Sequence, residues 1–164
     1  MSTDTIWPGI DGERVQEARL ARATQADIDA MTALERQAYP HPWQRSHFMD
    51  ALDSGYTLQC LLGADDALLG YYVAMLGVDE AHLLNVCVAP AHQGQGWGRV
   101  LLDDLDRWAR SHRAQWLWLE VRVSNTRARD IYLSHGYREV GQRKGYYPAA
   151  QGQREDALVM CLPL

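Results

Sequence analysis

The stretch that most constrains the fold of this chain is residues 83–109, where an apolar run, a glycine-rich turn and an amphipathic segment follow one another. Residues 83–88 are mostly apolar at both odd and even positions, which predicts a short buried strand, and Ala89-Pro90 ends it. After the turn, one face of a predicted helix is formed by Val100, Leu101, Leu105, Trp108 and Ala109. We expect Asp103, Asp104 and Asp106 to lie mostly off that face.

The turn itself, residues 93–99, has the sequence Gln-Gly-Gln-Gly-Trp-Gly-Arg. Glycines between a strand and a helix let backbone N–H groups face a ligand without a Cβ in the way, and the helix N-terminus adds partial positive charge. The turn therefore predicts a pyrophosphate cradle, with a simple tight connector as the alternative. Its Q-x-x-G-x-G spacing lacks the Lys-Ser/Thr of a nucleotide triphosphatase loop and the last glycine interval of a dinucleotide-binding fingerprint.

The remaining periodic segments predict the element order α, α, β, β, β, α, β, α, β, β, which favours a mixed α/β sheet covered by helices. Residues 1–17 are expected to form a loosely ordered extension, and residues 18–164 a single folded domain that opens with a short edge strand. Helices are expected after Thr24 and Ser46, which can act as N-caps. Between the last two strands we expect a loop rich in Gly, Tyr and Pro.

Composition narrows the function. The chain has 164 residues, 47% of them hydrophobic, and a net charge of −5. This charge disfavours a general nucleic-acid binder and suits a basic peptide or protein as partner. No apolar run approaches the ~20 residues of a membrane span, and the N-terminus has no apolar signal core. The three cysteines are far apart and the six histidines show no metal spacing, so we expect a cytoplasmic protein without a metal.

Glu120 interrupts the apolar strand that is predicted over residues 116–123. A carboxylate in such a strand is expected to be partly desolvated, which suits a general base. An ion pair with Arg122, two residues on and on the same strand face, explains it equally well.

Tyr132 lies on the helix predicted over residues 125–135, where Ala128 and His135 at helical spacing turn it toward the sheet. Such a tyrosine commonly just packs its ring. Its phenol can also donate a proton to a departing thiolate.

Several short motifs resemble the GCN5-related N-acetyltransferases (GNAT superfamily). The Q-x-x-G-x-G turn resembles their acetyl-coenzyme A motif, and residues 119–125, 131–132 and 135–137 resemble the second half of their core. Residues 79–81, 85–86, 146–148 and 154–157 narrow the resemblance to the bacterial ribosomal-protein-alanine N-acetyltransferases, the RimI type. The match runs from about Leu20 to the C-terminus and implies a mostly antiparallel central sheet flanked by helices.

The resemblance also implies roles for individual residues. Glu120 would be the general base and Tyr132 the general acid. The residues expected to bind acetyl-coenzyme A are Val86, Cys87 and Val88 by backbone bonds to the pantetheine arm, Gly94, Gln95, Gly96, Trp97, Gly98 and Arg99 around the pyrophosphate, and Asn125 at the arm again. Two positions depart from the family, because Gly94 stands where a basic residue is common and Trp97 where a smaller apolar residue is usual.

The implied activity is acetyl transfer from acetyl-coenzyme A to the α-amino group of an N-terminal alanine, by direct attack, on a basic protein such as a small-subunit ribosomal protein. Tyr146 and Tyr147 would border the peptide site, and Asp79, Glu80, Glu155 and Asp156 suit a substrate tail rich in Lys and Arg. No direct contact with nucleic acid or membrane is expected. Two alternatives are a small-molecule amine acetyltransferase and a non-catalytic acyl-coenzyme A-binding regulatory module.

Overall fold

The computed structural model describes the backbone of residues 3–8 and 15–164, and the side chains from residue 18 onward. The chain forms two compact units, which are described in turn. The first comprises Met1–Ala74 and Asn85–Leu101, and the second comprises Met75–Leu84 and Leu102–Leu164. Among the described residues, no helix is both long enough and apolar enough to cross a membrane.

The strands of the first unit run antiparallel in the order β1 (Thr3–Pro8), β2 (Val15–Arg22), β3 (Thr57–Leu62) and β4 (Leu68–Leu76). The predicted edge strand corresponds to β2, which begins before Ala18 and pairs with β3. β1 is a strand that the sequence pattern did not predict, because its pairing with β2 is not visible in a local period. Residues 1–2 and 9–14 of the predicted extension lie outside the described residues, and its boundary with a domain stays a prediction.

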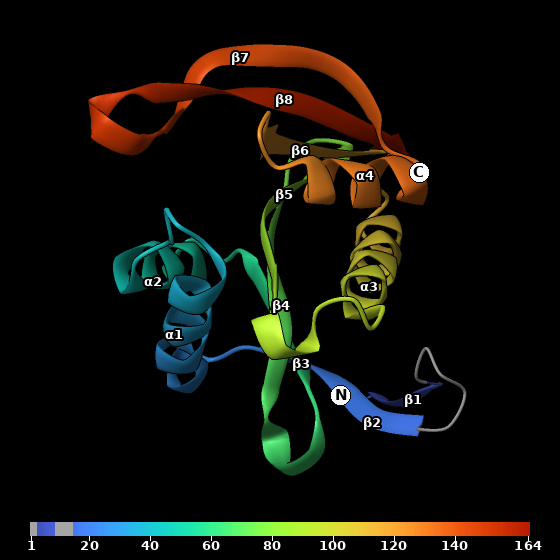
Figure 1. The fold of residues 1–164 in the computed structure, drawn as a ribbon. Helices are drawn as coiled ribbons and strands as arrows, with labels where there is room; N and C mark the ends of the chain where they lie inside the picture. Colours follow the sequence, from blue (N-terminus) through green and yellow to red (C-terminus); the bar gives the residue numbers. More distant parts are fainter. Residues whose placement is uncertain (1–2, 9–14) are drawn as a thin grey trace. The chain divides into compact units, whose positions relative to one another are not determined.

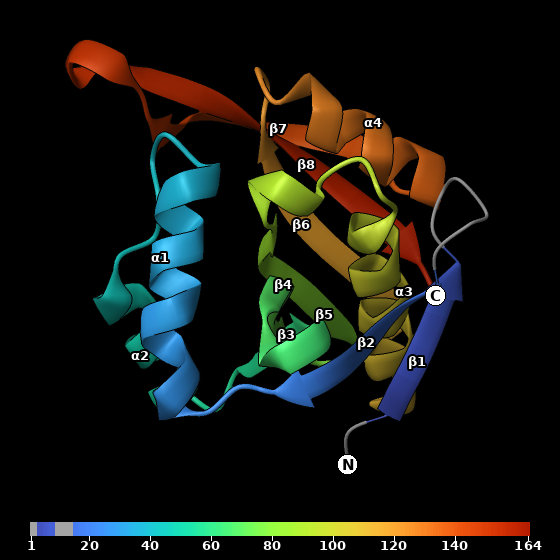
Figure 2. The same cartoon turned by 60° about the horizontal axis from the view of Figure 1, so that its bottom comes forward.

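The two predicted N-terminal helices are both present, as α1 (Ile28–Ala38) and α2 (Arg45–Asp53), and they lie next to each other (Figures 1 and 2). Thr24 and Asp27 form a capping box around the short 3-10 turn η1 (Gln25–Asp27), with the Thr24 N–H 2.8 Å from Asp27 Oδ2. α2 begins after Gln44 rather than after Ser46.

β5 (Glu80–Val88) runs through both units, and its last residues, from Asn85, belong to the first. Gly70 lets the backbone of β4 approach this part of β5 closely, since a Cβ built at residue 70 would lie only 2.5 Å from the Cys87 carbonyl oxygen. After the 3-10 turn η3 (Pro90–His92), the glycine-rich turn leads into α3 (Trp97–Ser111). The predicted strand–turn–helix unit is therefore confirmed.

The strands of the second unit follow the order β5, β6 (Trp116–Arg122), β8 (Arg154–Pro163) and β7 (Arg138–Pro148). β5 is parallel to β6 over the register from Glu80↔Trp116 to Leu83↔Leu119, and the other two ladders are antiparallel. α4 (Thr126–His135) begins after Asn125 and ends at Gly136, whose φ of 114° is left-handed. The mixed, mostly antiparallel α/β fold is thus confirmed.

The predicted extent of the loop between the last two strands was wrong. β7 continues through Lys144 and both tyrosines to Pro148, and pairs with β8 in the long hairpin seen in Figure 1. The register shifts between Glu139 and Gly141 and between Arg143 and Tyr147, and these irregularities accommodate the glycines that suggested a loop.

The apolar face of α3 is buried as predicted, but Asp106 is buried with it. Leu105 and Ala109 are fully buried, and Asp106 is 8% exposed. The prediction that Asp106 lies off the buried face was wrong, because its carboxylate pairs with His135 at the end of α4.

Candidate active site

The glycine turn has the backbone that an anion site requires. Gly94 and Gly96 have φ values of 76° and 90°, in the left-handed region, and a Cβ built at either would have no heavy atom within 4 Å. α3 opens with a bond from the Val100 N–H to the Gly96 carbonyl at 3.2 Å, so the N–H groups of its first turn precede the helical ladder. Open backbone at a helix N-terminus fits a pyrophosphate.

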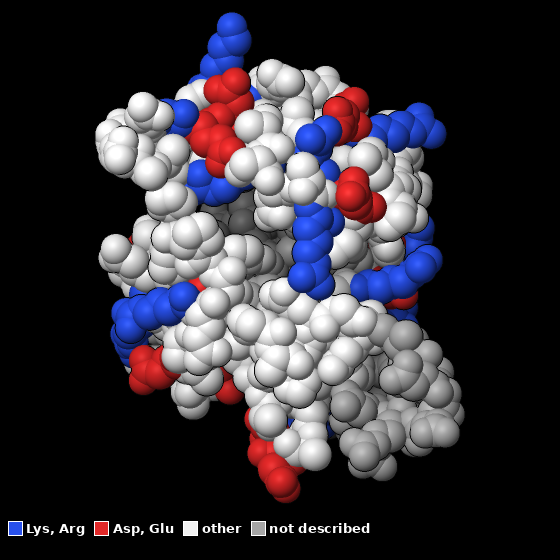
Figure 3. Space-filling model, in the orientation of Figure 1, with Lys and Arg blue, Asp and Glu red and all other residues white. Residues whose placement is uncertain are grey.

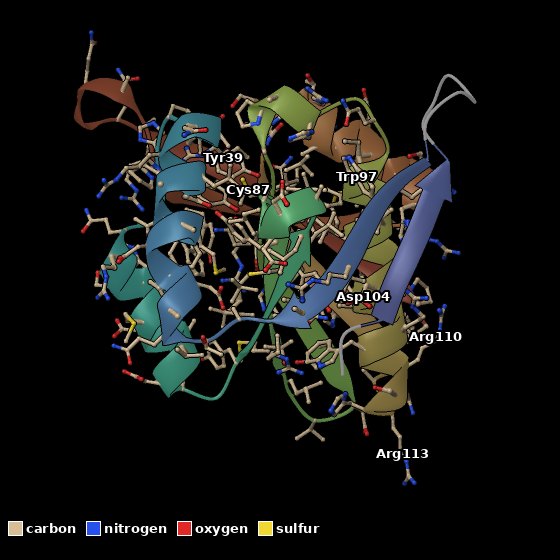
Figure 4. All side chains as sticks on the ribbon, turned by 90° about the horizontal axis from the view of Figure 1, so that it is seen from below. Tyr39, Cys87, Trp97, Asp104, Arg110 and Arg113 are labelled. Carbon is tan, nitrogen blue, oxygen red and sulfur yellow. The ribbon has the colours of Figure 1, made fainter. Side chains whose placement is uncertain are left out.

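The side chains of this turn divide into two kinds. The Trp97 indole is only 4% exposed, and its N–H donates to Gln95 Oε1 at 3.1 Å, so these two side chains bond to each other. Figure 4 shows Trp97 at the N-terminal end of α3. The Arg99 side chain is exposed. Gln95 and Trp97 are therefore suited to bind through their backbone, and Arg99 through its guanidinium.

The end of β5 lies beside the start of α3, since a Cβ at Gly98 would be 3.9 Å from Val88 Cγ2. The Val86 carbonyl accepts a hydrogen bond from the Tyr39 hydroxyl, and the Val88 carbonyl accepts one from Gln93 Nε2 at 3.1 Å. In the register that the structure describes, the ladder of β5 with β6 ends at Leu83, before these residues. A ligand arm along Val86–Val88 would thus meet carbonyls that already have one partner.

Cys87 is 1% exposed. Figure 4 shows it near Tyr39 in the inner part of the first unit. Burial, followed by the charge of Glu35, raises the pKa of the Cys87 thiol to about 12. The thiol therefore stays protonated at neutral pH, which fits a packed core residue rather than a nucleophile.

Glu120 is held by two basic side chains of the second unit. Its Oε2 lies 2.6 Å from His82 Nε2 and its Oε1 lies 3.5 Å from Arg143 Nη2. The Glu120 side chain is 8% exposed, whereas those of His82 and Arg143 are 30% and 56% exposed. A buried carboxylate is thus connected through an imidazole to the surface.

Arg122, the alternative ion-pair partner predicted for Glu120, bonds to other groups. Arg122 Nη1 donates to the Pro148 carbonyl at 2.7 Å and to Glu155 Oε1 at 3.2 Å. Its guanidinium also lies over the Tyr147 ring, 4.5 Å from the centroid. Arg122 therefore secures the β7–β8 hairpin.

Tyr132 is buried on α4, 8% exposed, with its ring 5.6 Å from that of Tyr137. Burial raises the pKa of the Tyr132 hydroxyl, so the phenol is protonated at neutral pH. Burial likewise raises the pKa of Tyr147, and the charges of Glu120 and, more weakly, Tyr132 add to this effect.

Other predicted residues have local tasks. Asn125 caps α4, its Oδ1 accepting from the Ala128 N–H at 3.2 Å. Hydrogen bonds from Ser124 and the guanidinium of Arg122 hold the pKa of Glu155 below its usual range. Asp156 Oδ1 accepts from the Gly145 N–H at 2.8 Å. Asp156 is therefore engaged within the β7–β8 hairpin, and Glu155 is engaged with β6 and the residues after it.

Charges are mixed on the face shown in Figure 3, where acidic and basic side chains are interspersed. Attraction of a basic substrate would therefore depend on local acidic groups rather than on one broad acidic field.

Three functional candidates escaped the sequence analysis. His82 and Arg143 meet Glu120 across strands, and no spacing within one segment reveals such a contact. Glu35 is 2% exposed and accepts hydrogen bonds from the Tyr71 hydroxyl, from Asn85 Nδ2 at 3.0 Å and from the Trp43 N–H at 3.1 Å. Its position seven residues after Ile28, on the apolar face of α1, was a signal that could have identified it.

Comparison with known proteins identifies the family of this chain. The profile of the Acetyltransferase (GNAT) family matches residues 28–137. The chain is 38% identical over 138 residues to the ribosomal protein bS18-alanine N-acetyltransferase of Salmonella typhimurium, covering 84% of this chain and 92% of that protein.

Solved structures give the same result. The ribosomal-protein-S18-alanine N-acetyltransferase of Escherichia coli has a TM-score of 0.81 and 34% identity, over 89% of this chain and 93% of that one. Naa20 of Chaetomium thermophilum, solved with a bisubstrate analogue, has a TM-score of 0.75 over 88% and 86% of the two chains, and at 24% identity it supports the fold alone. The chain belongs to the GNAT acetyltransferase family, with RimI-type relatives, and is an acetyl-coenzyme A-dependent N-acetyltransferase.

Proposed function

We propose that this enzyme acetylates the α-amino group of an N-terminal alanine on a ribosomal protein. The observation that carries the proposal is the 38% identity to an enzyme named for this reaction, extending over 92% of that enzyme's length.

In the proposed reaction, the substrate amine attacks the thioester carbonyl of acetyl-coenzyme A, so that a C–N bond forms and the C–S bond breaks. Glu120 accepts the proton that the amine loses. Tyr132 donates a hydrogen bond, and then its proton, to the departing thiolate. Burial raises the pKa of Tyr132, so the phenol is protonated and can donate a hydrogen bond to the sulfur as charge develops there, while the same shift makes the phenol a weaker acid. Backbone N–H groups of Val86–Val88 would stabilise the oxyanion.

His82 gives the proton on Glu120 a route to solvent. Its Nε2 lies 2.6 Å from the carboxylate, and its side chain is 30% exposed. Imidazole exchanges protons readily near neutral pH, which suits a group that must return Glu120 to its basic form after each turnover.

The acetyl donor would be held by the turn and the strand that precedes it. Gly94, Gly96 and Gly98, with the N-terminus of α3 and the exposed Arg99, would bind the pyrophosphate, with Gln95 and Trp97 contributing backbone groups. The backbone of Val86, Cys87 and Val88, together with Asn125, would bind the pantetheine arm.

An α-amine is the substrate that this base can serve. A free α-amine has a pKa of ~7.7–8.0, so roughly a tenth is neutral at pH 7, whereas a lysine at ~10.4 is almost wholly charged. One carboxylate is an adequate base for the first and a poor one for the second. Tyr146 and Tyr147, whose rings are 4.8 Å apart in a T-shaped arrangement, would wall the slot around the chain terminus. We expect this activity in the cytoplasm, without direct contact with nucleic acid.

The test uses three acceptors with acetyl-coenzyme A. Two are basic peptides of the same sequence, one with a free N-terminal alanine and one with a blocked N-terminus and free lysines, and the third is spermidine. Mass spectrometry should find the acetyl group on the terminal alanine of the first peptide only. Equal acetylation of both peptides, or acetylation of spermidine alone, would refute the terminal-amine assignment and indicate a lysine or small-amine acetyltransferase.

A further inference from the structure

Outside the proposed active site, the second unit contains a cluster of metal-ligating side chains between α3 and α4. It consists of Asp103, Asp106 and His135, whose ligand atoms all lie within 4.8 Å of one another. His135 Nε2 is 2.6 Å from Asp106 Oδ2, and His135 Nδ1 is 3.9 Å from Asp103 Oδ1. Asp103 and Asp106 are three residues apart, so they project from the same side of α3 toward the end of α4.

The second observation is a pair of buried polar atoms at the same place. Asp106 Oδ1 and the Tyr137 hydroxyl are both buried and have no hydrogen-bond partner. Asp106 is 8% exposed and Tyr137 2% exposed. The Tyr137 ring lies 6.2 Å from the His135 ring, so the phenol packs beside one member of the cluster.

An Asp–His ion pair alone leaves this arrangement incomplete. The His135 side chain satisfies one oxygen of Asp106, but Oδ1 would remain buried without a partner, and a buried polar atom without a partner is destabilising. The two carboxylates carry a charge of −2 against at most +1 on the imidazole. A divalent cation would neutralise both carboxylates and give Asp106 Oδ1 a partner.

We propose that Asp103, Asp106 and His135 form a binding site for a first-row divalent transition-metal ion such as Zn²⁺. Imidazole is a ligand that Zn²⁺ and its neighbours favour over Mg²⁺ and Ca²⁺, and two carboxylates complete a three-ligand set. Ligands of a tetrahedral Zn²⁺ are about 3.3 Å apart for bonds of ~2.0–2.1 Å, so small side-chain rotations would seat the ion. The fourth position would hold a water, with the Tyr137 hydroxyl as its hydrogen-bond partner.

Burial and exposure suit such a site. The side chains of Asp106 and His135 are 11% and 8% exposed, and that of Asp103 is 47% exposed, so the ion can enter past Asp103. Because the ligands come from two helices that Figures 1 and 2 show near each other, the ion would join the later turns of α3 to the last residue of α4. Sequence spacing could not reveal this site, since about thirty residues separate its two parts.

The experiment titrates the chelator-treated full chain with Zn²⁺ in a calorimeter and with Co²⁺ by visible absorption. We expect one ion per chain, a raised melting temperature with Zn²⁺, and Co²⁺ bands more intense than those of the aquo ion. Asp106→Asn and His135→Gln should each weaken binding at least ~10–100-fold, the loss typical even for removing a partner of a ligand. Asp103→Asn, at a half-exposed position that leaves the core intact, should also weaken binding and keeps the test valid if a buried variant fails to fold.

The matched control is Asp104→Asn. Asp104 follows Asp103 on α3, is labelled in Figure 4, and its carboxylate lies 3.6 Å from Arg107 Nη2. This variant should bind Zn²⁺ as the parent does. Absence of a stoichiometric ion in the parent, or equal binding by the parent and Asp106→Asn, would overturn the proposal. Acetyl transfer is not the readout, so neither outcome bears on the proposed function.

Discussion

Glu35, which is 2% exposed, and Glu120, whose side chain is 8% exposed, are two carboxylates, one in each unit of the chain, that are held by different kinds of partner. Glu35, on the apolar face of α1, accepts hydrogen bonds from a phenol, a side-chain amide and a backbone N–H. Glu120, in the apolar strand β6, is held by an imidazole and a guanidinium that are both partly exposed.

The difference indicates two functions for the same group. The donors to Glu35 are neutral and fixed, and one of them comes from β5 and another from the segment between α1 and α2, so this carboxylate joins three parts of the first unit. One partner of Glu120 is an imidazole, which can itself gain and lose a proton, and the other is a guanidinium. The chemistry of the partners therefore separates the two carboxylates, and on this ground we propose a base in Glu120 and a structural group in Glu35.

The largest effect is expected from Glu120→Gln. It should lower kcat by ~10²–10⁴-fold, the usual contribution of a general base, while leaving the melting temperature nearly unchanged. The deficit should shrink as pH rises, because the substrate amine then loses its proton without help. Steady-state rates from pH 6 to 9 test this, and a pH–rate profile that overlays that of the parent would assign Glu120 a structural task.

Glu35→Ala should act on stability instead. Removing the carboxylate leaves one buried and two part-buried donors without their acceptor, and we expect the free energy of unfolding to fall by about 3 kcal/mol. Urea unfolding measures this. Glu139→Ala is the control, since Glu139 pairs with Arg129 at a 39% exposed side chain, where a loss below ~1 kcal/mol is expected. Equal losses in the two variants would remove the contrast with Glu120.

Tyr71→Phe removes only one of the three donors to Glu35. The ring stays, packed edge-on against Phe48 at 5.5 Å, and only the hydroxyl that donates to Glu35 is lost. A hydrogen bond to a charged group contributes ~1.5–3 kcal/mol, and the unfolding free energy should fall by an amount in that range. If Tyr71→Phe is as stable as the parent, Glu35 is not held as we describe.

The smallest effect is expected from His82→Gln. Glutamine can still donate to Glu120 but cannot exchange a proton, so kcat should fall about tenfold with an unchanged KM for acetyl-coenzyme A. Added imidazole should restore part of the rate in this variant and none in Glu120→Gln. An unchanged kcat would show that His82 does not carry the proton.

The local features of the fold could be predicted from the sequence. The strand, glycine turn and helix around Gly94 and Gly96 were predicted from apolar periodicity, and the helix predicted over residues 125–135 matches α4 to within one residue. β1 and the extension of β7 to Pro148 were missed, because both depend on pairing with another strand. The glycines inside β7 suggested a loop, because the bulges that accommodate them depend on pairing with β8.

The residues of the candidate site also divide into those that the sequence could indicate and those that it could not. Glu120 and Tyr132 stand out within their own segments, and their roles stay proposals. His82 could not be predicted, because its contact with Glu120 depends on the register of β5 against β6. The sequence pattern predicted Asp106 on the solvent side of α3. It is buried because His135 of α4 covers it, and the pattern within α3 does not show this contact.

A Cβ at residue 70 would lie only 2.5 Å from the Cys87 carbonyl oxygen, and this limits which substitutions the chain can tolerate. Every codon change that replaces Gly70 adds at least one carbon at that point. The strand proposed to carry the donor's arm is therefore sensitive to a residue that meets neither substrate. In a library of all single substitutions, residue 70 should be among the least tolerant positions, and an inspection limited to catalytic contacts would give no reason for it.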